Sequence, residues 1–164
     1  VSAPLVLLAM NKQGYINLTK LVSKAFVEGQ VNGEPIVLFR WLEEFSDGII
    51  ALSGGLEGHI GSSVLAGNEQ LSESRIEFFK KIFNDNFFIE IQRTGKANEE
   101  EYNNSVIELA TKMGVPIVAT NNVRFLISLR NEMSSLSSLV LIFSIFLFII
   151  ATLINYRKLK IYIY

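Results

Sequence analysis

The only histidine of the chain, His59, lies in a glycine-rich stretch over residues 54–61. A histidine in such a stretch can be a metal ligand, a general base or simply a surface side chain. A catalytic triad or a metal cage would also need further histidines or carboxylates close by. The two aspartates, Asp47 and Asp85, stand in turns beside Gly or Asn, where aspartate forms local hydrogen bonds. We therefore expect no catalytic residue in this chain.

Glu90 is the other residue with possible chemistry, because it lies in an apolar run over residues 87–92 that is typical of a strand. Its side chain is either a carboxylate in a pocket or one half of an ion pair with Arg93 or Arg124, and we expect the pair. The glycines of 54–61 lack the Gly-Lys-Ser/Thr ending of a phosphate-binding loop and the spacing of a dinucleotide fingerprint. They are better explained by backbone geometry.

Apolar runs and helical spacings alternate along the first 126 residues. A largely parallel α/β sheet is expected from this alternation, with polar groups at the carboxyl ends of its strands lining any site. One helix is expected to begin with a capping box of Asn98 and Glu101 and to end at Gly114, with carboxylates at 99–101 complementing its dipole. The expected strands are 5–8, 49–52, 87–92 and 115–120, and the other expected helices are 18–26, 38–45 and 71–83.

Composition excludes some classes of function. The chain has 164 residues, 15 basic and 16 acidic side chains and a net charge of −1, so it carries no global positive field that would attract nucleic acid or an anionic membrane. It has no cysteine, which excludes disulfides and thiolate metal sites. The first ten residues lack the features of a secretory signal. They are typical of a strand entered in mid-domain, so we expect the true N-terminus to lie before Val1.

Three segments that follow predicted strands resemble one known family. They are SGGLEGHI (53–60), EIQRTG (90–95) and VATNNVRF (118–125), and NLTKLVSKA (17–25) strengthens the match. In order and spacing they are similar to consecutive motifs of the PHP (polymerase and histidinol phosphatase) domain at the N-terminus of the DNA polymerase III alpha subunit. The resemblance covers about residues 4–126. It implies a distorted (β/α)7 barrel, of which residues 1–126 would form an incomplete part.

Members of this family with an intact site bind a small cluster of divalent metals that supports phosphoester hydrolysis. Such a cluster needs several converging carboxylates or imidazoles. The resemblance places other residue types at four ligand positions, and the His-x-His motif of the family would lie before Val1. The replacements are His59 for Glu, Thr94 for His, Asn122 for Asp and Arg124 for His.

This pattern of replacements implies a vestigial site without metal or cofactor, since an arginine cannot be deprotonated to become a ligand. A branch of the family with similar replacements is thought to keep its PHP domain for structure and for docking the proofreading exonuclease subunit. Contact with DNA would be made by other domains of the polymerase. The family is cytoplasmic.

Residues 127–164 differ sharply in composition from the rest. They contain no glycine or proline and a single acidic residue, Glu132. The uncharged run 136–154 would span roughly 28 Å as a helix, close to the thickness of the bilayer core. We therefore expect a hydrophobic C-terminal helix that is either a membrane anchor or an out-of-frame product of a disrupted gene. The coding DNA after Phe125 decides between them.

The leading hypothesis is a fragment of the replicative DNA-directed DNA polymerase III alpha subunit, inactive alone because the polymerase active site lies outside this chain. A membrane-anchored, non-enzymatic interaction module is the alternative. A metal-dependent PHP phosphoesterase that uses His59 and Glu90 is a weaker one.

Overall fold

The computed structural model describes residues 2–121 and 158–163. Within them, five strands form one sheet in the spatial order β6-β5-β4-β1-β7, and a two-stranded hairpin stands apart. The predicted apolar runs form strands of this sheet, as expected for strands covered on both faces. The strands are β1 (Ala3–Ala9), β2 (Gln30–Val31), β3 (Glu34–Pro35), β4 (Ile49–Leu52), β5 (Phe87–Ile91), β6 (Ile117–Ala119) and β7 (Lys158–Ile163).

The sheet is mixed, so the expectation of a largely parallel sheet was only partly correct. β5 pairs in parallel with β4 and with β6, but β1 is antiparallel to both of its neighbours, β4 and β7. The connection explains the difference, because two helices lie between β1 and β4 and the chain returns to the end where β1 stopped. There the Met10 N–H donates to the Gly48 carbonyl at 2.9 Å.

Four α-helices correspond to the predicted ones, although α1 begins six residues earlier than expected, and one α-helix is added. The helix α3 was missed because its region is rich in glycine. A Cβ at Gly61 would lie 2.4 Å from the Leu56 carbonyl oxygen, so close packing against the preceding turn explains a glycine inside this helix. The helical elements are α1 (Lys12–Glu28), α2 (Phe39–Glu44), η1 (Gly55–Glu57), α3 (His59–Leu65), α4 (Glu69–Phe83), η2 (Asn84–Asn86) and α5 (Glu99–Met113).

The expected capping box at the start of α5 was wrong. Asn98 has a left-handed backbone with φ of 61°, and its side chain makes no capping hydrogen bond. Glu99, the next residue, instead turns its carboxylate back to the loop that precedes the helix. Local sequence suggested a cap, but the tight loop after β5 sets a different geometry.

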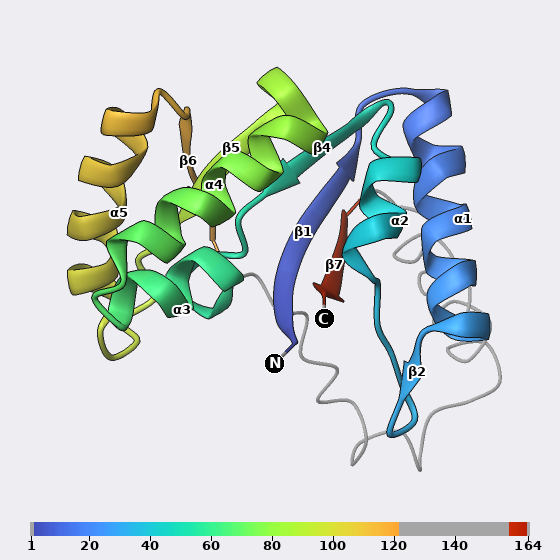
Figure 1. The fold of residues 1–164 in the computed structure, drawn as a ribbon, viewed down its shortest axis with the longest axis horizontal. Coiled ribbons are helices and arrows are strands. Elements are labelled where there is room, and N and C mark those ends of the chain that lie inside the picture. Colours follow the sequence, from blue (N-terminus) through green and yellow to red (C-terminus); the bar gives the residue numbers. More distant parts are fainter. Residues whose placement is uncertain (1, 122–157, 164) are drawn as a thin grey trace, which may run out of the picture.

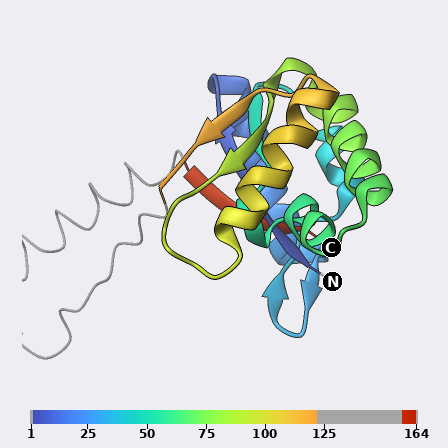
Figure 2. The same cartoon turned by 90° about the vertical axis from the view of Figure 1, so that its left-hand side faces the viewer.

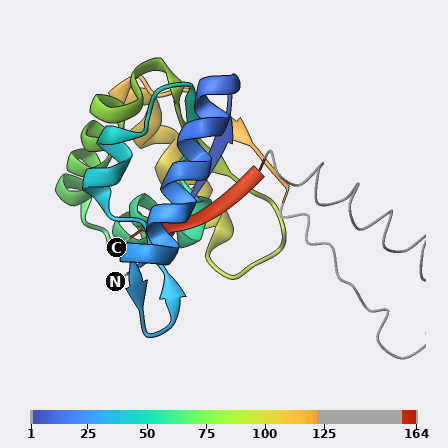
Figure 3. The same ribbon diagram turned by 90° about the vertical axis from the view of Figure 1, so that its right-hand side faces the viewer.

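The helices form two groups around the sheet. Figure 1 shows α3, α4 and α5 together on the left and α1 with α2 on the right, with β1 and β4 between the groups. The views in Figure 2 and Figure 3 show the β2–β3 hairpin projecting from the body of the molecule. Its turn places Asn32 and Gly33 at positive φ, the combination that suits a tight hairpin.

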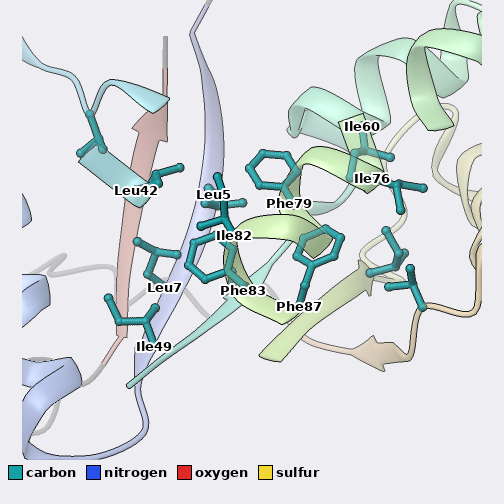
Figure 4. Packing of buried hydrophobic residues seen from close by; sticks show 14 of the residues in the cluster. Leu5, Leu7, Leu42, Ile49, Ile60, Ile76, Phe79, Ile82, Phe83 and Phe87 are labelled. Atoms are coloured by element: carbon teal, nitrogen blue, oxygen red, sulfur yellow. The ribbon is translucent and has the colours of Figure 1, made fainter. Parts of the chain in front are cut away.

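The core fills the space between the sheet and both groups of helices. Figure 4 shows Phe79 of α4 beside β1 and Phe87 at the start of β5. The Phe79 and Phe87 rings are stacked with centroids 5.3 Å apart, and each side chain is at most 2% exposed. Other fully buried side chains include Leu5, Leu7, Leu21, Leu42, Ile49, Ile60, Ile76, Ile89 and Tyr102.

The structure bears only partly on the predicted tail. The apolar run 136–154 and the boundary at 126 and 127 lie outside the described residues. Of the helices within residues 2–121 and 158–163, none is long and apolar enough to cross a bilayer. The last strand, β7, pairs with β1 over six residue pairs from Ala3↔Ile163 to Leu8↔Lys158.

Candidate functional site at the strand ends

The carboxyl ends of β4, β5 and β6 meet at one edge of the sheet, because these strands are parallel neighbours. Ser53 follows β4, and its hydroxyl accepts the Glu90 N–H at 2.9 Å. Thr120 follows β6, and its N–H donates to the Ile91 carbonyl at 3.0 Å. Backbone pairing thus places side chains from three distant segments around the end of β5.

Glu90 is the carboxylate at the centre of this edge, and it is 1% exposed. Its Oε1 accepts hydrogen bonds from Gln92 Nε2 at 3.0 Å and from the Thr120 hydroxyl. Gln92 Nε2 also donates to Thr120 Oγ1 at 3.1 Å, which closes a three-residue cluster. The second carboxylate oxygen, Oε2, has no hydrogen-bond partner among the described residues.

The expected ion pair of Glu90 with Arg93 is not formed. The side chain of Glu90 bonds to two neutral groups instead: the amide of Gln92, which lies two residues later and just past the end of β5, and the hydroxyl of Thr120. Arg124, the other expected partner, lies outside the described residues. Gln92 and Thr120 were not singled out from the sequence, although the two-residue spacing of Glu90 and Gln92 was a usable indication.

Tyr102 of α5 packs against the end of β5. Its hydroxyl donates to the Glu90 carbonyl at 2.9 Å, and the residue is 1% exposed. Burial, together with the nearby charge of Glu90, raises the pKa of Tyr102 above its usual range. The phenol therefore keeps its proton, and its O–H donates the hydrogen bond to the Glu90 carbonyl.

Thr94, one of the four replaced ligand positions, is held by Glu99. The Glu99 carboxylate accepts the Thr94 hydroxyl at 2.8 Å, the Thr94 N–H at 2.6 Å and the Gly95 N–H at 2.9 Å. Burial would raise the pKa of Glu99, but these hydrogen bonds and one from the Lys96 backbone outweigh it and lower the pKa. The sequence-based expectation of a dipole-capping role missed this loop contact.

His59, the first replaced position, is the first residue of α3 and lines a different hollow. Its ring lies 5.2 Å from the ring of Phe39, centroid to centroid. The side chain of Glu90 makes its hydrogen bonds to Gln92 and Thr120 and none to His59. Asn122 and Arg124, the remaining replaced positions, lie outside the described residues.

The donors at this edge do not fit a cluster of metal ions. Among residues 2–121 and 158–163, no three His, Cys, Asp or Glu side chains are grouped so that they could hold a cation. Glu90 offers a single free carboxylate oxygen, and its neighbours are an amide and a hydroxyl. Two or three close cations need several anionic ligands to be neutralised. Within the described residues, the arrangement holds one buried carboxylate in place and offers too few anionic ligands for such a cluster.

Comparison with known proteins assigns this fold to a family. A family model described as "PHP domain" matches residues 2–94. The chain belongs to the PHP domain family. The match covers β1 to β5 and ends at Thr94, so it includes the Glu90 strand and the glycine-rich turn before α3.

Relatives of this PHP chain include DNA polymerase III alpha subunits. The chain is 44% identical over 122 residues to that of Pseudomonas aeruginosa and 45% identical over 122 residues to those of Vibrio cholerae and Escherichia coli strain K12. Each alignment covers 74% of this chain and 10% of the relative. The resemblance inferred from the motifs is thus confirmed, and the chain spans about a tenth of the length of these relatives.

Proposed function

We propose that residues 1–126 are a structural and docking part of a DNA polymerase III alpha subunit and have no catalytic activity of their own. The observation that carries the proposal is the state of Glu90, the carboxylate at the strand ends. It is held by Gln92 and Thr120 rather than placed beside other charged ligands. A carboxylate tied to neutral donors supports the shape of the strand ends without supplying charge for catalysis.

The replaced ligand positions support the same proposal. Thr94 is engaged by Glu99, and His59 packs beside Phe39. Both residues therefore have structural contacts where the family pattern has metal ligands. The finer parts of the proposal are a distorted (β/α)7 barrel, of which this chain forms part, and the proofreading exonuclease subunit as the docking partner. Polymerisation and DNA contact would belong to other domains of the parent polymerase.

The decisive experiment is an activity assay with the purified chain. We expect no Mn²⁺-dependent release of phosphate from a phosphate monoester and no release of nucleotides from single-stranded DNA. A Glu90→Gln variant should behave identically, because the carboxylate has no catalytic role. Mn²⁺-dependent release that is lost in Glu90→Gln would contradict the proposal and establish the phosphoesterase alternative.

Docking is tested separately by titrating the purified chain with the proofreading exonuclease subunit of a related bacterium. We expect a saturable complex that forms equally well with and without Mn²⁺, because the contact needs no metal. Absence of a complex at high micromolar concentration would contradict the docking role. Recovery of the intact chain from carbonate-washed membranes would instead favour the membrane-anchored module, and the downstream reading frames test the out-of-frame origin of residues 127–164.

A further inference from the structure

A hollow of about 620 Å³ lies beside the start of β1, between α3 and α4. This volume is in the range of pockets that take a small ligand. The hollow contains none of Glu90, Thr94 or Glu99, so it is separate from the strand-end cluster. Its lining is Ser2, Ala3, Phe39, Glu57, His59, Ser62, Ser74, Arg75, Phe78 and Phe79.

Aromatic rings from two helices, α2 and α4, form one wall of this aromatic hollow. Phe39 of α2 meets Phe78 of α4 edge to face, with ring centroids 5.1 Å apart. The ring of Phe39 also lies 6.1 Å from that of Phe79, which is 2% exposed and fixes the base of the wall in the core. Because Phe39 and Phe78 are only half-buried, parts of both rings remain available to a flat apolar group.

Arg75 supplies a positive charge to the same hollow. Its Nη1 donates to the His59 carbonyl and to Ser62 Oγ at 3.1 Å, both on α3. These acceptors are neutral, and within the described part of the chain no carboxylate forms an ion pair with Arg75. A guanidinium has five N–H donors in a planar fork. The two hydrogen bonds of Nη1 therefore orient the guanidinium, while the N–H groups of Nη2 and Nε remain for a ligand.

The lining holds one arginine and one carboxylate, so it favours a ligand with a single negative charge over a dianion. Glu57 also lines the hollow, and its Oε1 pairs with Lys96 Nζ at 2.5 Å. A dianion such as a phosphate monoester would meet the Glu57 carboxylate as well as the Arg75 cation. A carboxylate needs one bidentate partner, which a guanidinium fork provides.

We propose that the aromatic hollow binds an aryl carboxylate, with the aromatic ring against Phe39 and Phe78 and the carboxylate on Arg75. The same chemistry occurs in a free aromatic acid and at the end of a peptide whose last residue is aromatic. This inference does not rest on the docking role proposed above, because the strand-end carboxylate Glu90 and its partners Gln92 and Thr120 lie outside the hollow.

The test is an NMR titration of the full ¹⁵N-labelled chain with 3-phenylpropionate. We expect saturable shifts confined to residues that line the hollow. Four further ligands separate the contributions of the carboxylate charge and of the aromatic ring to binding. The neutral 3-phenylpropionamide and the dianion phenyl phosphate should bind about tenfold more weakly, because a charge-assisted hydrogen bond is lost or repulsion is added. Acetate should not saturate, and N-acetyl-Ala-Phe distinguishes a chain end from a free acid.

Variants of the full chain test the role of Arg75. Arg75→Gln should weaken 3-phenylpropionate binding by about tenfold or more, and Arg75→Lys should weaken it less, because the charge is kept and the fork is lost. Arg40→Gln is the matched control, since Arg40 lies outside the hollow, and should leave binding unchanged.

Three results would overturn the proposal: no saturable shift with 3-phenylpropionate, equal affinity of the acid and its amide, or unchanged affinity in Arg75→Gln. The comparison of acid and amide uses the unaltered chain. It therefore decides the question even where Arg75→Gln disturbs α3.

Discussion

The carboxylate of Glu99 is a buried anion that the chain satisfies with its own donors. Two backbone N–H groups and one hydroxyl, all from Thr94 and Gly95, point at its two oxygens. Successive N–H groups of a tight loop form a concave anion site. In this chain the carboxylate of Glu99 occupies that site, so the loop after β5 is bonded to the first turn of α5.

The lowered pKa of Glu99 predicts a pH-dependent stability. Because the folded pKa lies below the unfolded value of about 4.3, the ionised group stabilises the fold above that pH. This contribution is lost as the pH falls through the folded pKa. Glu99→Gln should therefore be less stable than wild type at pH 7, and the difference should shrink toward pH 3, as measured by urea unfolding.

Glu101→Gln is the control for this experiment, because Glu101 lies in the same helical turn and is exposed. We expect its stability to follow that of wild type across the pH range. An equal loss in both variants would mean that charge at the start of α5, rather than the contact with Thr94 and Gly95, produces the effect.

At the scale of elements, α1 is fixed to the start of β4 by an approach of two backbones. A Cβ built on Gly14 would lie 1.8 Å from the Gly48 carbonyl oxygen. Asn11 Oδ1 caps the helix by accepting the Gly14 N–H at 2.9 Å, and Asn17 Nδ2 donates to the Asp47 carbonyl at 2.9 Å. The glycine therefore lets the helix come close enough for these bonds to form.

Gly14→Ala should destabilise the protein by about 1–3 kcal/mol, because the added methyl group forces α1 away from the turn. This cost opposes the usual gain from replacing a helical glycine by alanine. Gly67→Ala is the comparison, since nothing lies within 4 Å of a Cβ at Gly67 and only the strain of its φ of +65° remains. Urea midpoints give both values, and a stabilised Gly14→Ala variant would refute the close approach.

Several of these elements could be predicted from the sequence because local pattern determines them. The apolar runs of β1, β4 and β5 and the helical spacing of α1, α4 and α5 need only the chain itself. The antiparallel place of β1 could not be predicted, since it depends on two helices packing together before the chain returns. The helix α3 was hidden by Gly61, whose close contact is tertiary.

The candidate site was predictable to a smaller extent. Glu90 was singled out from its place on a strand, but it was expected to form an ion pair. Its actual partner Thr120 follows β6, so the contact depends on sheet register. The contact of Thr94 with Glu99 lies in the loop before α5, where Asn98 has a left-handed backbone that the predicted capping box did not anticipate. Local pattern thus located the site, while its hydrogen bonds followed from packing.

At the scale of the whole molecule, β7 covers the edge of the sheet that β1 would otherwise expose. Ala3 to Leu8 pair with Ile163 to Lys158, so strands from the two ends of the sequence lie side by side. An uncovered strand presents unpaired N–H and carbonyl groups to other chains. The pairing therefore stabilises β1 and protects it from association.

Proline substitutions in β7 test this pairing. In an antiparallel ladder, alternate residues direct their N–H toward the neighbouring strand. Of the adjacent variants Lys160→Pro and Ile161→Pro, one should lose a ladder hydrogen bond and about 1–3 kcal/mol, and the other should be tolerated better. Each variant controls for the other. Two unfolding curves that match wild type would show that β7 is not paired with β1 in solution.

Because Ala3 and Ile163 lie side by side, the same fold could form from a chain in which the elements follow one another in a different order. A few flexible residues joining these positions would close the backbone into a ring without moving any strand. That ring can be opened at Gly67, an exposed turn before α4 where a side chain would meet nothing. The resulting circular permutant would begin with α4 and carry β7 and β1 as a continuous hairpin in its interior.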